Sequence, residues 1–182
     1  GRAALAPAPT PSHRLTDAEL SGLSGLYRSR VDGRYVRLVR DGDALRIDRG
    51  QRLIAQSGTR QVTAGGQTWQ FTGQGRVQVG DRYDVIEYER VAPASPMADE
   101  LLRLAGTYVS DEIETVLTVS IDNGRLVVSR RPDTRLTLTP IYEDAFEAAG
   151  LGLVRFQRDT AGRVTGLRVN QDRVWDLHFV KQ

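Results

Sequence analysis

Some groups of side chains in this sequence have the residue types that chemistry requires. Asp111, Glu112 and Glu114 form the densest acidic cluster, and carboxylate oxygens are the ligands that hard cations such as calcium prefer. Their spacing matches no calcium-binding loop, and the similar segment 31–34 carries only one acidic residue. We therefore interpret the cluster as a solvated turn and expect no metal site and no cofactor.

A second group pairs His178 with Asp176, which suggests an acid–base pair. In an extended strand these two residues lie on one face, and Trp175, Leu177 and Phe179 lie on the other. If the aromatic side chains point inward, His178 points outward. Because no nucleophile can be placed within reach, we expect no catalytic residue here. The segment 22–26 also lacks the second glycine of a Gly-x-Ser-x-Gly elbow.

A third group consists of aromatic residues at strand positions that are expected to face inward. They are Tyr27, Trp69, Phe71, Tyr83 and Tyr88 in one half, and Tyr108, Phe146, Phe156, Trp175 and Phe179 in the other. Such rings could line an apolar cavity, and Tyr27, Trp69, Tyr108, Phe156 and Trp175 are the candidate ligand-binding residues. A filled core would use the same rings. We favour it, because a barrel of about eight strands is only just wide enough for its own side chains.

The elements that would position these side chains occur twice. The pattern Glu-Leu-x-x-Leu-x-Gly-x-Tyr covers Glu19 to Tyr27 and recurs 81 positions later, from Glu100 to Tyr108. The same offset aligns 36–47 with 117–128, and near the end 86–90 aligns with 177–181. A period this long is too large for a solenoid unit, so we interpret it as two copies of one small domain.

Each copy opens with a short predicted helix and continues as strands. Thr16 and Glu19 form a capping-box pattern, and 95–100 contains a second helix start, so helices are predicted over 17–23 and 97–104. Gly25 and Gly106 suit the helix exits. Alternating apolar residues and glycine-containing turns then predict strands. These cover 26–30, 35–40, 44–48, 53–56, 61–64, 67–72, 76–79 and 83–91, and then 106–110, 116–121, 125–130, 135–139, 145–148, 153–158, 164–170 and 174–180.

These elements predict an all-β protein made of two tandem, small antiparallel β-barrels of about eight strands, each preceded by a short helix. Closure is expected because it removes exposed strand edges. The predicted domains are a linker or disordered segment at 1–15, a first barrel at 16–91, a linker at 92–97 and a second barrel at 98–182. One larger barrel or sandwich shared by both copies is the competing arrangement.

Composition restricts the partners. Cysteine is absent, which excludes disulfides and thiolate chemistry. The net charge is +2, and the arginines are scattered along predicted strands, so we expect no nucleic-acid partner. No apolar run approaches the length of a membrane span, so we expect no membrane insertion. The heavy use of arginine over lysine indicates a bacterial source rather than a function.

The second copy also has a recognisable order of short motifs. These are Leu-Ala-Gly-Thr-Tyr at 104–108, Asn-Gly-Arg-Leu at 123–126, Leu-Thr-Pro-Ile-Tyr-Glu-Asp-Ala-Phe at 138–146, Val-Arg-Phe-Gln-Arg-Asp at 154–159 and Gly-Arg-Val-Thr-Gly-Leu at 162–167. Together they resemble the lipocalin-like β-barrel domain that follows the catalytic domain in many bacterial serine hydrolases of the β-lactamase and penicillin-binding type. The resemblance spans 98–182. The first copy, 17–91, is similar more loosely and lacks the Asp-Ala-Phe stretch.

In that family the catalytic domain carries a Ser-x-x-Lys pair, and the barrel is an accessory. The only lysine here is Lys181, and His178 stands three residues before it, so the chain contains no such pair. The resemblance therefore implies a non-enzymatic, periplasmic or secreted region that packs on a serine hydrolase domain of the same parent chain and modulates substrate access or oligomerisation. Homo-oligomers are left open. The alternative is a stand-alone lipocalin-like module that binds a small apolar ligand, and a weaker one is an independent hydrolase.

Overall fold

The computed structural model describes residues 9–81, 83–130, 133–171 and 176–182. The chain divides into two compact units, Gly1–Val91 and Ala92–Gln182. Each unit has its own antiparallel sheet, and the two sheets contain eight and nine strands. They form two nearly closed barrels, each with one short helix before its first strand, which confirms the predicted all-β tandem fold. A single sheet shared by both copies, the competing arrangement, is not what the structure has.

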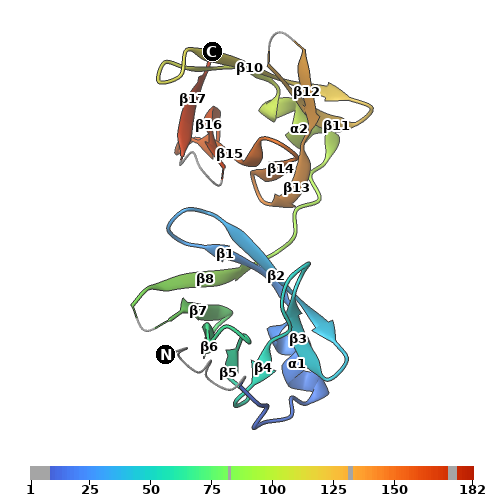
Figure 1. The fold of residues 1–182 in the computed structure, drawn as a ribbon. Coiled ribbons are helices and arrows are strands. Elements are labelled where there is room, and N and C mark those ends of the chain that lie inside the picture. The colour runs from blue at the N-terminus through green and yellow to red at the C-terminus, as the bar shows by residue number, and fades with distance from the viewer. Residues whose placement is uncertain (1–8, 82, 131–132, 172–175) are drawn as a thin grey trace. The chain divides into compact units, whose positions relative to one another are not determined.

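The first barrel is an up-and-down meander whose first and last strands pair (Figure 1). Tyr27 in β1 lies opposite Arg90 in β8. Between β3 and β4, Leu53 N–H donates a hydrogen bond of 2.7 Å to the Leu45 carbonyl. The strands are β1 (Gly25–Ser29), β2 (Tyr35–Asp41), β3 (Ala44–Ile47), β4 (Ile54–Ala55), β5 (Arg60–Val62), β6 (Thr68–Gly73), β7 (Arg76–Gly80) and β8 (Val85–Val91).

The second barrel closes in the same way, through β9 and β17 (Figure 1). The strand predicted at 135–139 is divided, because Leu138 donates its N–H to the Leu126 carbonyl and the chain then changes partner from β11 to β14. The strands are β9 (Gly106–Ser110), β10 (Thr115–Asp122), β11 (Arg125–Arg130), β12 (Thr134–Thr137), β13 (Thr139–Tyr142), β14 (Ala145–Ala148), β15 (Gly152–Arg158), β16 (Val164–Asn170) and β17 (Leu177–Lys181).

The two helices begin as the sequence indicates. In α1 (Asp17–Leu23), the Thr16 hydroxyl accepts a bond from Glu19 N–H, and the Glu19 carboxylate accepts one of 2.7 Å from Thr16 N–H. Each bond satisfies a backbone donor that the helix itself leaves unpaired. In α2 (Ala98–Leu104), Glu100 accepts the N–H of Met97 at 2.7 Å. Met97 thus occupies the N-cap position, one residue before the helix begins. No helix in the described part of the chain is long and apolar enough to cross a membrane.

Each barrel encloses its own apolar core, because alternate residues of every strand point to the same side. The first core contains Leu15, Leu20, Tyr27, Leu38, Leu45, Leu53, Ala55, Trp69, Phe71, Val77 and Val79. The second contains Leu101, Leu104, Tyr108, Leu117, Val119, Leu126, Val128, Leu138, Phe146, Ala148, Val154, Phe156, Leu167, Val169 and Phe179. Leucines from both helices take part, so each helix belongs to its barrel.

Part of the segment assigned to a linker contacts the first barrel. The backbone N–H groups of Ser12 and His13 donate to the Ala55 carbonyl in β4, at 3.0 and 3.3 Å. Gln56 donates its side-chain amide to the Thr10 carbonyl at 2.9 Å, and Leu15 is buried in the core. Residues 10–15 therefore run along β4.

Candidate functional site

The candidate ligand-binding aromatics lie inside the two cores. Tyr27 and Trp69 are 1% and 3% exposed in the first barrel, and Tyr108 and Phe156 are 0% and 6% exposed in the second. Trp175 lies outside the described residues. Burial of such rings contributes to stability through their large apolar area.

The rings contact one another within each core. The centroids of Tyr27 and Phe71 lie 6.2 Å apart, and those of Tyr108 and Phe156 lie 5.8 Å apart, both edge to face. Phe146 meets Phe156 in the same way at 5.6 Å. This is the favourable geometry for aromatic pairs. The candidate residues thus act as neighbours in a packed core.

Tyr83 is the aromatic residue that departs from the expected pattern. It was expected to face inward, but it is 89% exposed. The reason is that β8 begins at Val85, so Tyr83 belongs to the turn after β7, where its N–H donates to the Asp81 carboxylate at 2.8 Å. A turn residue does not follow the alternation of a strand.

The two tyrosines that open the barrels each connect a strand to the preceding helix. The Tyr27 hydroxyl donates to the Leu23 carbonyl at 2.8 Å, and the Tyr108 hydroxyl donates to the Leu104 carbonyl at 2.6 Å. Both acceptors belong to the last helical turn, whose carbonyls have no partner within the helix. Burial raises the pKa of both hydroxyls, so both remain protonated donors.

A basic residue of the last strand reaches the same helix ends. In the first barrel, Arg90 donates to the Gly22 carbonyl at 2.7 Å and to the Ser24 carbonyl. In the second, the Lys181 ammonium donates to the Arg103 carbonyl at 2.8 Å. Positive charge is favourable at a helix C-terminus, because the helix dipole is negative there. The tyrosine, the basic residue and these carbonyls together form what we term the helix–barrel junction.

Glycine is required at each helix–barrel junction because the basic side chain passes close to the backbone. Gly25 and Gly106 have φ angles of +154° and +152°. A Cβ atom would lie 2.8 Å from Arg90 Nε at Gly25, and 2.7 Å from Lys181 Cε at Gly106. Sequence reasoning placed these glycines at the helix exits but missed Arg90 and Lys181. The available signal was that a basic residue stands at the aligned position of both copies.

The acidic cluster lies in the turn between β9 and β10. Asp111, Glu112 and Glu114 are all exposed there, and Glu114 has a positive φ of 48°. Across the described residues, no group of three or more histidine or acidic side chains is arranged to hold a metal ion.

The predicted pairing of His178 with Asp176 is wrong. Asp176 precedes β17 and has a φ of +59°, so the two residues do not share one face of an extended strand. Its carboxylate instead pairs with Arg155 at 3.3 Å and with Arg168. Phe179 is buried, so the alternation of β17 places His178 on the outer face.

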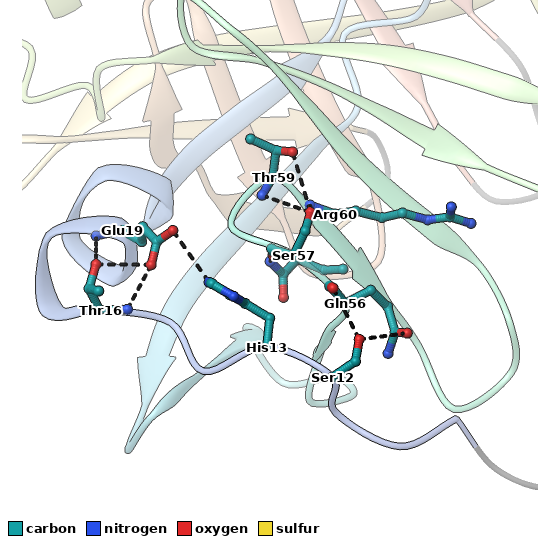
Figure 2. Close-up of polar contacts among 9 residues, drawn as sticks. Ser12, His13, Thr16, Glu19, Gln56, Ser57, Thr59 and Arg60 are labelled. Atoms are coloured by element: carbon teal, nitrogen blue, oxygen red, sulfur yellow. Dashed lines mark hydrogen bonds and ion pairs between the residues drawn. The ribbon is translucent and has the colours of Figure 1, made fainter.

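Another polar group joins the N-terminal segment to the loop after β4 (Figure 2). His13 Nε2 lies 3.5 Å from a carboxylate oxygen of Glu19, which is also the capping residue of α1. The Ser12 hydroxyl donates to the Gln56 carbonyl at 3.0 Å, and the Ser57 hydroxyl accepts the N–H groups of the next turn. These bonds use both hydroxyls in backbone contacts, as expected for a segment that docks a chain end rather than activates a serine.

No known protein-family model matches this chain, and comparison with curated proteins also finds no match.

Proposed function

We propose that residues 1–182 form a non-catalytic accessory region of a larger bacterial serine hydrolase of the β-lactamase type, in the periplasm or outside the cell. Its role is to pack on the catalytic domain and to modulate substrate access or oligomerisation. The sequence resemblance of 98–182 supports this proposal. The observation that carries it is the use of the interior: Tyr27, Trp69, Tyr108 and Phe156 pack in the cores.

The helix–barrel junctions support the same proposal. The hydroxyls of Tyr27 and Tyr108 are the polar groups that could orient a ligand inside a barrel. Both donate to helix carbonyls instead. An interior committed to its own packing leaves the outer surface as the place where each barrel can act on another domain.

The proposal is tested on the natural protein whose reading frame contains residues 1–182. We expect the frame to encode a domain with Ser-x-x-Lys, and we expect deletion of 1–182 to change kcat/KM for p-nitrophenyl acetate or nitrocefin, or to change the oligomeric state. A frame without that domain would refute the proposal, as would a deletion that leaves both properties unchanged. A small apolar molecule found in native mass spectra of the purified chain would favour the ligand-binding alternative.

A further inference from the structure

Three valines lie side by side on the outside of the second barrel. Val109 in β9 is paired in register with Val116 in β10 and with Val180 in β17. Their strand neighbours Tyr108, Leu117 and Phe179 are buried, so alternation places the valines on the outer face. Val116 and Val180 are each 49% exposed. We refer to these three residues as the valine row.

The first barrel provides an internal comparison, because the same positions there carry different residues. Arg28 in β1 is paired in register with Tyr35 in β2 and with Glu89 in β8. Arg28 and Glu89 form an ion pair, and Arg30 lies 3.9 Å from the Glu89 carboxylate. The Arg28 hydrogen bond is the main reason that the pKa of Glu89 is lowered. The two copies share a backbone pattern, but this row is charged in one and apolar in the other.

The next position of each row differs in the same direction. Glu89 is paired with Arg76 in β7, whereas Val180 is paired with Gly166 in β16. Gly166 adds no side chain beside Val180. A Cβ there would lie 2.4 Å from the Phe179 carbonyl oxygen, so the close backbone approach requires glycine. The valine row therefore ends in a bare backbone, where the first barrel has a further charge.

We propose that the valine row is the surface on which the catalytic domain of the parent hydrolase docks, an inference that rests on the proposed function. Because β9 pairs with strands on both sides, a partner cannot extend the sheet there and must contact side chains. The row carries no charge, so its partner presents an uncharged apolar face. Exposed apolar groups of this kind mark interaction surfaces when they are contiguous.

The size of the valine row selects a tethered partner over a second copy. A stable interface between free proteins buries about 800 Å² on each side, far more than three partly exposed valines offer. A domain of the same chain is held at a high effective concentration, so a small contact is enough. The occupant is therefore a folded domain of the same polypeptide outside residues 1–182.

Photocrosslinking of the full-length parent protein tests this docking directly. We expect Val180→p-benzoylphenylalanine to crosslink to a peptide of the same chain outside residues 1–182. The matched control is Glu89→p-benzoylphenylalanine, at the corresponding position of the first barrel, which should give no such product. Crosslinks to a second copy alone, or no crosslink from position 180, would overturn the inference.

Kinetics separate this inference from the proposed function. Each methyl replaced by a hydroxyl should weaken the apolar contact about fourfold, so V109T/V116T/V180T should weaken docking about sixtyfold. It should reproduce the effect of deleting 1–182, while R28T/Y35T/E89T should not. If the deletion changes hydrolysis and the valine variant does not, the docking surface is wrong and the proposed function stands. If the deletion changes neither hydrolysis nor oligomeric state, both fail. The crosslink decides the question if either variant misfolds.

Discussion

Replacing Tyr108 by phenylalanine should destabilise the second barrel through the loss of one hydroxyl. The ring stays, so the contact with Phe156 and the Lys181 ammonium 5.7 Å from the ring centroid are retained. What is lost is the 2.6 Å bond to the carbonyl of Leu104, a residue that is only 2% exposed. Loss of such a bond, with its buried acceptor left unpaired, costs about 1–3 kcal/mol. The first barrel predicts a smaller cost for Y27F, because Leu23 is less buried there.

The assay is urea unfolding followed by hydrogen–deuterium exchange mass spectrometry, which follows each unit through its own peptides. We expect Y108F to lower the unfolding free energy of residues 98–182 and to leave the first unit unchanged. The control is Y83F, which removes the same hydroxyl from an exposed turn residue and should change stability by less than about 0.5 kcal/mol. If Y108F costs no more than Y83F, the tyrosine does not hold the helix to the barrel, and the reasoning on the helix–barrel junction fails.

Other substitutions test other contacts. G106A should cost about 1–3 kcal/mol in urea unfolding, because alanine is strained at a φ of +152° and its Cβ would displace Lys181; a neutral result would contradict the need for glycine. G58A should loosen α1, since its Cβ would lie 2.2 Å from a Glu19 oxygen, and faster amide exchange in residues 17–23 would show this. The pKa of Glu89 lies below its ordinary value of 4.5, so its contribution is complete above that pH and is lost as pH falls through the lowered pKa. The stability difference between E89Q and the unchanged protein should therefore shrink from about pH 7 to about pH 3, and a constant difference would refute the ion-pair explanation.

The sequence predicted the helices and most strands because their signals are local. Thr16 and Glu19 lie within one helical turn, and a capping box needs no other part of the chain. Strand alternation and glycine turns likewise act over a few residues. Predictions failed where the local signal was ambiguous: Leu138 divides one predicted strand, and Tyr83 and Asp176 lie in turns.

The candidate site was predictable only in part. The aromatic residues were identified from their types and positions, and Tyr27, Trp69, Tyr108 and Phe156 are indeed buried. Their bonds could not be predicted, because the tyrosine hydroxyls reach helix carbonyls through a particular turn of the chain. Direction of a side chain in space is not contained in its spacing along the sequence.

The sequence by itself determined the duplication, the strand content and the position of a glycine at each helix exit, since each depends on residues close together or on identity between the copies. Only the tertiary structure decided which distant residues meet. Closure pairs β1 with β8 and β9 with β17, and this brings Arg90 and Lys181 to the helix ends. The same closure assembles the valine row, because Val180 becomes the neighbour of Val109 only when the barrel closes.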